Sequence, residues 1–355
     1  MFDLYSGNTP SRLNKEHFKG TVNWISSGEL KEHYIYSSKE QISEEAAKSL
    51  KLLPVGTFVI AIYGLEAEGV RGTGSIIQEP STISQACMSF IPKGVIENEF
   101  LYSWYKKHGN VIGIRYAQGT KQQNLSYDIL EKFMIVYPNT KEQEKLNKFI
   151  SLLDERIATQ NKIIEDLKKL KSAISKKLLC NDKWSTCIIQ DIAEIGRGRV
   201  ISSVEIERQK HPLYPVYSSQ TSNDGIMGYL DDYMFDSEYI TWTTDGANAG
   251  TVFYRKGKFN CTNVCGTLKI LPKFDCYFVS LVLQQATQKY VSSNLANPKL
   301  MNNTMASIKI RMPNIETQKQ LSKVFQTLDS CLLVHQRTCK MYLSEKQYLL
   351  RQMFI

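Results

Sequence analysis

Side chains that could carry out catalysis are present in this 355-residue chain, but their spacing matches no catalytic motif. Asn297-Pro298 is followed by Lys299, whereas a DNA adenine methyltransferase needs a second proline and then an aromatic residue there. Gly72-Thr73-Gly74 is only a fragment of a dinucleotide-binding fingerprint, and no phosphate-binding loop ending in Gly-Lys-Ser/Thr occurs. The five His residues show no paired spacing on one helix. These absences favour a chain that binds rather than catalyses.

The eight cysteines form no recognisable framework for a metal or for disulfides. Cys261, Cys265 and Cys276 come closest to metal-ligand spacing, but no second pair and no nearby histidine accompany them. We therefore interpret the cysteines as buried thiols in a reducing compartment. Residues 1–6 lack the pattern of a signal peptide, and no apolar run approaches about 18 residues. We expect a cytoplasmic protein that does not enter a membrane.

Polar side chains in the predicted loops offer a different chemistry, the binding of a nucleic acid. The formal net charge of +9 favours a polyanionic partner. Basic side chains contact phosphates, and Arg, Lys, Asn and Gln also contact base edges, so the run Gln122-Gln123-Asn124 could make paired hydrogen bonds to adenine. The candidate DNA-binding residues are Ser26, Arg71, Lys121, Gln122, Gln123 and Asn124 in the first half and Arg197, Arg199, Asn248, Lys299, Asn302 and Asn303 in the second. The alternative for each is that a polar loop is simply solvated, or that its amides cap a neighbouring helix.

Two domains of the same type must position these loops. Residues 1–137 are predicted to form a mixed α/β domain, with a buried strand at 58–63, a Gly-rich loop at 64–74 and further strands and a helix after it. The same order of parts returns after residue 181: 239–242 matches 59–62, 250–253 matches 74–77, and 277–280 matches 100–103. The strands agree in pattern and the loops differ, which suggests one architecture that binds two different things.

Each domain is followed by a long amphipathic helix, and the second helix repeats the first at a distance of 175 residues. Apolar residues recur at alternating steps of three and four, which is the heptad pattern of a coiled coil. The polar interruptions repeat as well, since Gln160 maps to His335 and Lys171 to Lys346. The predicted seam residues are Leu146, Ile150, Leu153, Ile157 and Ile164 in the first helix and Leu321, Phe325, Leu328, Leu332 and Tyr342 in the second.

The sequence therefore predicts four segments: domains at 1–137 and 181–312, and long helices at 138–180 and 313–355. A chain that carries two copies of one domain-plus-helix unit can mimic a homodimer, so we expect an internal pseudo-two-fold repeat. Two similar α/β domains would then be separated by two long antiparallel coiled-coil helices. A helix of about 38 residues is about 57 Å long, which matches one to two turns of DNA at about 34 Å each. From periodicity alone, a simple spacer or dimer arm remains the alternative.

The repeat also reveals a missing part. The second domain has residues 184–192 before its Gly196-Arg197-Gly198 turn, whereas the first domain begins almost at the equivalent turn, Ser6-Gly7-Asn8. The first copy therefore lacks a leading strand. Either the chain starts late, or another segment fills the position.

Taken together, these features resemble the specificity subunits of type I restriction-modification systems. The resemblance is carried by the helix-start motif at 138–146 with Leu152-Leu153-Asp154, and by its second copy with Pro313-Asn314, Gln318, Leu321 and Leu328-Asp329. The loop at 119–125 and the opening at 184–198 belong to it too. The second copy departs from the family pattern at Glu316-Thr317-Gln318, where an acidic residue usually stands directly before the glutamine.

The resemblance implies a non-catalytic subunit of a type I restriction endonuclease and DNA adenine methyltransferase complex. Each target recognition domain would read one half of a split double-stranded DNA target, and the helices would set the gap and hold two modification (methyltransferase) subunits. Restriction (translocase and nuclease) subunits would join the complex. The partners, and not this chain, would use S-adenosylmethionine, ATP and magnesium. The alternatives are a non-catalytic coiled-coil scaffold or binding protein without a split DNA target, and an enzyme with an unrecognised site.

Overall fold

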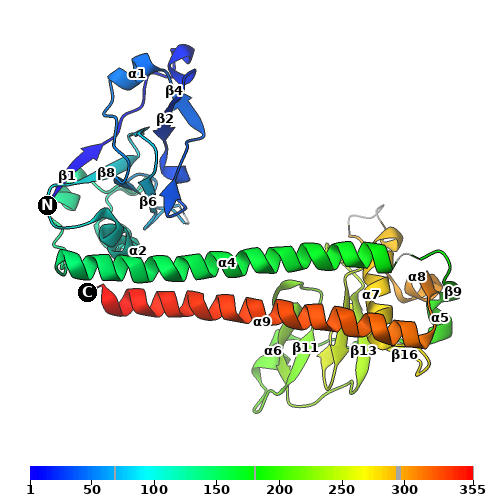
Figure 1. The fold of residues 1–355 in the computed structure, drawn as a ribbon. Coiled ribbons are helices and arrows are strands. Elements are labelled where there is room, and N and C mark those ends of the chain that lie inside the picture. Colours follow the sequence, from blue (N-terminus) through cyan, green and yellow to red (C-terminus); the bar gives the residue numbers. More distant parts are fainter. Residues whose placement is uncertain (68, 180, 293–296, 355) are drawn as a thin grey trace. The chain divides into compact units, whose positions relative to one another are not determined.

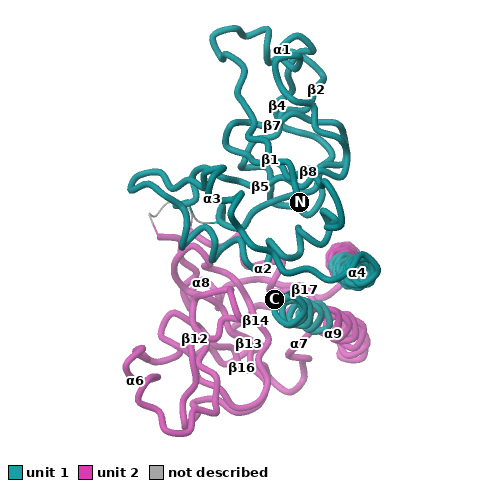
Figure 2. The backbone as a smooth tube through the Cα atoms, turned by 90° about the vertical axis from the view of Figure 1, so that its left-hand side faces the viewer, with its two compact units in different colours: residues 1–161, 337–355 teal, residues 162–336 magenta. Residues whose placement is uncertain are grey.

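The computed structural model describes residues 1–67, 69–179, 181–292 and 297–354. The chain divides into two compact units (Figure 2): unit 1 contains residues 1–161 and 337–355, and unit 2 contains residues 162–336. Each unit combines one α/β domain with part of both long helices, and the mixed α/β character predicted for both domains is confirmed. Cys180 and Ile355, the last residues of the two predicted helix segments, lie outside the described residues.

The described residues of unit 1 form two sheets and three short or medium helices beside its parts of the two long helices. The larger sheet has the order β1 (Phe2–Ser6), β8 (Cys87–Pro92), β5 (Phe58–Ala61), β6 (Gly74–Ile77) and β3 (Tyr34–Ile35). The smaller sheet has the order β4 (Glu40–Ile42), β2 (Val22–Ile25) and β7 (Ser81–Ile83). The helices are α1 (Glu44–Lys48), α2 (Asn98–Tyr116) and α3 (Tyr127–Glu131), with 3₁₀ turns at Lys15–Phe18 and Ser27–Glu29. Every residue of β5 is buried, as expected for its unbroken apolar run.

Unit 2 follows the same plan. Its main sheet has the order β10 (Ala193–Arg197), β16 (Cys265–Ile270), β13 (Glu238–Thr243) and β14 (Val252–Lys256). A second sheet contains β12 (Ile226–Leu230), β11 (Tyr214–Tyr217) and β15 (Asn260–Cys261), and a third pairs β17 (Lys309–Met312) with β9 (Ser185–Ile188). The helices are α5 (Ile189–Ile192), α6 (Ser203–Glu207), α7 (Cys276–Ala286) and α8 (Asn302–Ser307), with 3₁₀ turns at Ser222–Gly225 and Thr287–Tyr290. The apolar face of α7 packs on the main sheet in the core of the unit.

The two long helices are α4 (Thr140–Leu178) and α9 (Ile315–Met353), each of 39 residues (Figure 1). In unit 1, Lys346 Nζ of α9 donates a hydrogen bond to Asp154 Oδ2 of α4 at 2.7 Å, and Cys339 contacts Asn161. Because the contact partner moves backward along α9 as α4 advances, these two segments are antiparallel. In unit 2, Lys171 of α4 forms an ion pair with Asp329 of α9. Within the described ranges, no helix combines the length and the apolar character needed to cross a membrane.

The predicted seam lies on the less exposed side of both helices. Its buried members are Ile150, Leu153, Ile157 and Phe325, and its half-buried members are Leu146, Ile164, Leu321, Leu328, Leu332 and Tyr342. Near the helix ends the seam packs on a domain as well. Leu146 contacts the apolar core of unit 1, and Phe325 belongs to the core of unit 2. The same stripe therefore anchors each helix to the domain beside it.

Both copies of the helix-start motif contain a buried glutamine that forms the same kind of hydrogen bonds. The Gln143 side chain donates hydrogen bonds to the carbonyl oxygens of Val95 (2.7 Å) and Pro138 (2.9 Å) and accepts one from the backbone N–H of Glu97 (2.9 Å). Gln318 repeats this in unit 2, where it donates to Pro313 O at 2.8 Å and accepts from the N–H of Asp275 at 2.9 Å. Each glutamine thus connects the start of a long helix to the start of a domain helix.

These two glutamines correct the sequence alignment by one position. They make Glu97 the counterpart of Asp275, so Phe100 corresponds to Phe278 and not to Tyr277 as the sequence comparison predicted. The hydrogen bond from the first turn of α2 or α7 to the buried glutamine shows which residues of the two helices are equivalent. Two apolar stretches of sequence can be aligned almost equally well when one is shifted by a residue.

The apolar run at 133–136 favours a strand, but among the described residues this segment is not assigned as a strand. In unit 2 the equivalent residues form β17, which pairs with β9. In unit 1, β1 pairs with β8 as β10 pairs with β16, so the first strand of unit 1 corresponds to β10. Among the described residues, no strand of unit 1 stands where β9 does, and 133–137 are not assigned as a strand. A β-strand is completed by hydrogen bonds to a neighbour, which this segment lacks.

Candidate nucleic-acid interface

Two loops of unit 1 bring most of the first set of candidate residues together. The backbones of Gln118 and Asn124 exchange two hydrogen bonds of 2.8 and 2.9 Å and close a tight loop between them. Gly119 in this loop has a φ of +115°, and a Cβ there would lie 2.0 Å from the carbonyl oxygen of Gln122. Only glycine fits that position. The loop therefore holds Lys121 and Gln122 at its tip, where both side chains are exposed.

The second loop, described at residues 64–67 and 69–73, forms hydrogen bonds with the first through Gln123. Arg71 donates a hydrogen bond of 2.8 Å to Gln123 Oε1, and the N–H of Gln123 donates to Glu66 Oε2 at 2.7 Å. Backbone hydrogen bonds to its carboxylate lower the pKa of Glu66, and the N–H of Gln123 provides the largest of them. Leu65 also donates its N–H to the carbonyl oxygen of Gln123 at 3.0 Å. Two loops far apart in sequence thus form one polar surface.

Some side chains of this surface form hydrogen bonds within the protein, and others are exposed without such a bond among the described residues. Arg71, Gln123 and Asn124 are half-buried, and the side chain of Gln123 is occupied by Arg71. An open groove of about 500 Å³ next to the loop is lined by Tyr63, Gln118, Gln122 and Asn124 among others. Lys121 and Gln122 have no side-chain hydrogen-bond partner within the described part of the chain, and such free donors can bind a ligand.

Ser26 stands apart from these loops. Its hydroxyl donates to Glu29 Oε2 at 2.6 Å and its N–H donates to the same atom at 2.9 Å. The hydroxyl therefore has a local structural partner, the first turn of a 3₁₀ helix, and no contact among the described residues joins it to Lys121 or Arg71.

In unit 2 the carboxylate of Asp245 forms ion pairs with two of the candidate residues, Arg197 and Lys299. Asp245 lies 3.5 Å from the Arg197 guanidinium through Oδ2 and 3.6 Å from Lys299 Nζ through Oδ1. Arg197 also donates to Thr244 Oγ1 at 3.0 Å, and the Asn302 amide donates to the carbonyl oxygen of Gly196, next to Arg197, at 3.3 Å. Residues from three separate parts of the chain meet at this point. Sequence reasoning missed Asp245, which sets the geometry of both cations.

The other candidates of unit 2 lie on neighbouring loops. Asn248 donates to the carbonyl oxygen of Ser219 at 3.0 Å, and Asn303 is exposed on α8. Arg199 forms a two-point ion pair with Glu205, which belongs to α6. Hydrogen bonds from Arg199 hold the pKa of Glu205 below its ordinary value. Arg199 is thus partly neutralised in this structure, whereas Asn303 is free to bind.

A second residue that the sequence analysis missed is Arg255. Its side chain is only 3% exposed, its guanidinium lies 3.6 Å from the centre of the Tyr217 ring, and it donates a 2.7 Å hydrogen bond to Asp224. Asp224 and Asn223 have positive φ values of 54° and 49°. The sequence Asn223-Asp224-Gly225 is a signal for such a turn. Arg255 therefore fixes a strained, exposed loop beside Ser219, the partner of Asn248.

The two polar surfaces are suited to binding. Both present amide and cationic groups: the candidates of unit 1 include three amides and two cations, and those of unit 2 include three amides and three cations. Among the residues that the structure describes, no group of three or more His, Cys, Asp or Glu side chains could hold a metal ion. The contacts with DNA predicted for these residues stay predictions, because the geometry shows which side chains are free and not what they bind.

Comparison with known proteins gives a consistent result. The sequence profile described as the type I restriction modification DNA specificity domain matches residues 1–169 and 181–340. A putative type I specificity subunit of Mycoplasma pneumoniae is 38% identical over 193 residues, which are 54% of this chain and 80% of that protein. The specificity subunit of the type I restriction enzyme MpnII from the same organism is 43% identical over 145 residues, which are 41% of this chain and 43% of that protein.

The fold has solved counterparts as well. The crystal structure of a type I restriction-modification system S subunit from M. genitalium matches with a TM-score of 0.69 at 17% identity. The match covers 100% of this chain and 94% of that one. At this level of identity the likeness concerns the fold.

Proposed function

The chain belongs to the family of type I restriction-modification DNA specificity subunits, and from that membership we propose that each of its two units reads one half of a split DNA target. A specificity subunit selects the DNA sequence and is the non-catalytic part of its complex. The observation that carries the proposal is the doubled family match, because residues 1–169 and 181–340 each carry the same DNA specificity domain.

The polar surfaces described above are the parts that we assign to DNA reading. In unit 1, Lys121 and Gln122 are exposed at the tip of a loop closed by two backbone hydrogen bonds, and in unit 2 Lys299 and Asn303 lie in the equivalent region. Lysine contacts phosphates without regard to sequence, whereas amide side chains distinguish base edges. The different composition of the two surfaces agrees with two different half-sites.

The long helices are assigned a spacing and docking role. We propose that α4 and α9 form an antiparallel coiled coil with an internal pseudo-two-fold relation. The support is an ion pair that recurs once in each unit: adding 175 to Asp154 gives Asp329, and adding 175 to Lys171 gives Lys346. The helix pair would hold two modification subunits, which use S-adenosylmethionine, and restriction subunits, which use ATP and magnesium, would complete the endonuclease.

The test is to purify the chain together with its cognate modification subunit and to map the methylation of random genomic DNA. The expected result is a two-part motif with a fixed gap. A palindromic motif would mean that only one unit reads DNA, as a symmetric pair. If no complex and no motif were found, the competing proposal of a scaffold without a split target would take its place.

Variants of the two surfaces provide matched controls for each other. Gln122→Ala should relax one half of the motif and leave the other half unchanged, and Asn303→Ala should do the reverse, since the residues lie in different units. Lys121→Ala and Arg199→Ala should weaken DNA binding and reduce its salt dependence, by about one unit of slope for each phosphate that the variant no longer neutralises. Unchanged affinity in both the lysine and the arginine variant would remove these residues from the proposed interface.

A further inference from the structure

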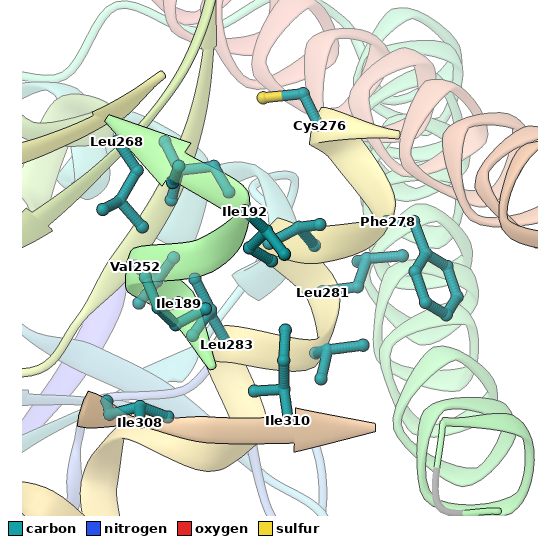
Figure 3. Packing of buried hydrophobic residues seen from close by; sticks show 14 of the residues in the cluster. Ile189, Ile192, Val252, Leu268, Cys276, Phe278, Leu281, Leu283, Ile308 and Ile310 are labelled. Carbon is teal, nitrogen blue, oxygen red and sulfur yellow. The ribbon is translucent and has the colours of Figure 1, made fainter. Parts of the chain in front are cut away.

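Hydrogen bonds of the two main sheets show which residues of the two units are equivalent. In unit 1, β8 pairs with β1 and β5, and in unit 2, β16 pairs with β10 and β13. Leu268 of β16 lies in the apolar core of unit 2 with Ile192 and Val252 (Figure 3), and Phe90 of β8 lies in the core of unit 1. If Phe90 and Leu268 are equivalent, the hydrogen bonds around them match as well, and three further pairs of positions follow.

The first pair of positions lies at the end of the edge strands β1 and β10. Ser6 pairs with Met88, and Arg197 pairs with Gly266. Both partners stand two residues before the core residue of their strand. The glycine that follows Ser6 or Arg197 donates its N–H to the residue just before that partner, at 3.2 Å in unit 1 and 3.1 Å in unit 2. Ser6 and Arg197 are therefore equivalent.

The second pair of positions follows strands β5 and β13. The N–H of the residue before Tyr63 donates to the carbonyl oxygen of Ala86, and the N–H of the residue before Asp245 donates to that of Val264, at 2.9 Å in both units. Ala86 and Val264 each stand four residues before the core residue of their strand. Tyr63 and Asp245 are therefore equivalent.

The third pair of positions lies in the loop next to these strands. The backbone of Asn124 forms a bridge with Gln118, and that of Lys299 forms one with Ser292. The N–H of the residue after Asn124 or Lys299 donates to the carbonyl oxygen of the residue before the second position, at 2.9 Å in both units. Asn124 and Lys299 are therefore equivalent.

This register moves two of the sequence matches. Residues 59–62 correspond to 241–244, and residues 74–77 correspond to 252–255, so the sequence comparison was wrong by two positions in both cases. A shift of two residues along a strand keeps the same side chains on the buried face, so the alternation of apolar residues does not reveal it.

In unit 1 the three positions carry neutral side chains that line one groove. Ser6, Tyr63 and Asn124 border the open groove of about 500 Å³, whose lining residues are all uncharged. Tyr63 is 39% exposed, and neither its hydroxyl nor that of Ser6 has a hydrogen-bond partner among the described residues. Asn124 Oδ1 is buried without a partner, although buried polar atoms are normally hydrogen-bonded. The groove therefore offers hydrogen-bonding groups that a ligand can satisfy.

In unit 2 the same positions carry charges that pair with one another. Asp245 forms ion pairs with Arg197 and Lys299, so the three charges sum to +1. Arg197 Nε also donates to the carbonyl oxygen of Asn263 at 2.5 Å, which holds the guanidinium in place. Its Nη1 donates no hydrogen bond within the described part of the chain. The guanidinium is thus oriented and still has a free donor.

We propose that the three equivalent positions form a base-reading point in each unit, which reads adenine in unit 1 and guanine in unit 2. The amide of Asn124 offers a donor and an acceptor side by side, which matches N7 and N6 of adenine, whereas the guanidinium of Arg197 offers donors only, which matches O6 and N7 of guanine. Ser6 and Tyr63 add hydroxyl groups beside the amide. Asp245 positions Arg197 and balances one of the two cations. The inference rests on the proposed function, since it names the bases that each unit reads.

The first test exchanges the two sets of side chains in the complex with the modification subunit. The variant Ser6→Arg/Tyr63→Asp/Asn124→Lys gives unit 1 the residues of unit 2. Methylation mapping of random genomic DNA should then show a G·C base pair at one position of the half-motif of unit 1 where the original protein requires A·T. An unchanged half-motif of unit 2 would show that the variant folds and assembles. Methylation of the original motif by this variant would overturn the proposal.

A single variant decides the case if the triple variant does not fold. Asn124→Ala removes the amide alone and should lower the preference for A·T at the same position about tenfold. The measurement is the ratio of methylation rates on two duplexes that differ only at that base pair. The same ratio for a base pair in the half-motif of unit 2 is the internal control and should not change.

Asp245→Asn tests unit 2 with a readout that a purely structural residue would not change. The variant should lower the preference for guanine about tenfold. Binding to a duplex without the motif should at the same time depend more steeply on salt, by about one unit of slope, because one more positive charge is left unbalanced. Glu238→Gln is the matched control and should affect neither quantity, since Glu238 pairs with Lys256 (3.3 Å) at the opposite end of β13.

An unchanged base preference in both Asn124→Ala and Asp245→Asn would remove these positions from the reading surface. A position that responds to the variants but specifies another base would contradict the assigned chemistry. Failure of the proposed function would appear differently, as the absence of a two-part motif in methylation by the original chain, so the two results can be distinguished.

Discussion

At the scale of single residues, Gln143 and Gln318 have the clearest role. Both are almost completely buried, and each side chain bonds backbone groups from two parts of the chain. A buried amide of this kind is costly to remove, because its partners are left without hydrogen bonds away from water. These residues explain why the helix-start motif is repeated around a glutamine.

Gln143→Leu should therefore lower the free energy of unfolding by about 3 kcal/mol, since it leaves the Glu97 N–H and two carbonyl oxygens unsatisfied. Gln318→Leu should have a similar effect in unit 2. Urea unfolding measures both, and Glu144→Ala, an exposed change one residue away, should stay within about 0.5 kcal/mol of the original protein. If both leucine variants lost less than about 0.5 kcal/mol of unfolding free energy, the hydrogen bonds of these glutamines would not be needed for stability.

Buried thiols give a prediction about pH. Burial raises the pKa of both Cys87 and Cys276 from an ordinary value of 9.0 to about 12. The folded state therefore favours the neutral thiol, and this contribution to stability is complete below pH 9 and is lost as the pH rises toward 12. Each thiol should add a slope of up to about 1.4 kcal/mol per pH unit in that window.

Urea unfolding between pH 8 and pH 10.5 checks this slope. The Cys87→Ala variant should be less stable at pH 8 because the core around it is less well packed, but its stability should fall less steeply as the pH rises. If the free energy of unfolding fell equally steeply with pH in the variant and in the original protein, the slope could not be assigned to the Cys87 thiol.

At the scale of elements, the ion pairs between α4 and α9 fix how the helix segments align. Asp154 and Lys346 are 34% and 21% exposed, so water screens their interaction only in part. Burial lowers the pKa of Lys106, and the charge of Lys346 lowers it further. Asp154 thus balances Lys346, which otherwise stands beside a second lysine.

A double-mutant cycle on Asp154 and Lys346 should show that removing the aspartate destabilises the protein more than removing the lysine. Asp154→Asn should cost about 1 to 2 kcal/mol, because it leaves Lys346 without its ion-pair partner beside the like charge of Lys106, and Lys346→Gln should cost less, because it also relieves Lys106. We expect a coupling energy of about 1 kcal/mol from urea unfolding of the four proteins. Equal costs for the two single variants would mean that Lys106 does not feel the charge of Lys346.

At the scale of the whole molecule, the helices are proposed to set the gap between the two half-sites. Adding one heptad to each helix, after Asn161 in α4 and after Gln336 in α9, inserts residues at the boundary of the two units. The ion pairs inside each unit would be preserved. Seven residues lengthen a helix by about 10 Å, which is about three base pairs of DNA.

Methylation mapping should then return the same two half-motifs with a gap about three base pairs longer. The appropriate control is a seven-residue Gly-Ser insertion in the exposed loop at 208–213, which should leave the gap unchanged. If the gap stayed constant in the heptad variant, something other than the helices would determine it.

Features that arise from the local spacing of residues could be predicted from the sequence. The sequence was enough to predict the 175-residue repeat, the apolar stripe of the helices, the mixed α/β domains and the family. Helices and strands have characteristic spacings of apolar residues, which can be recognised along the chain. The order of residues also placed Lys121 and Gln122 in a loop, where both are exposed.

Contacts between residues far apart in the sequence became clear from the fold. Lys171 and Lys346 were polar interruptions without assigned partners until the fold brought each to an aspartate 158 and 192 residues away. Asp245 and Arg255 had no local signal of their roles, since their partners lie on other loops and strands. Residues 133–137 have the composition of a strand, but no strand of the described residues pairs with them. Contacts between distant segments depend on packing and register, which spacing along the chain does not encode.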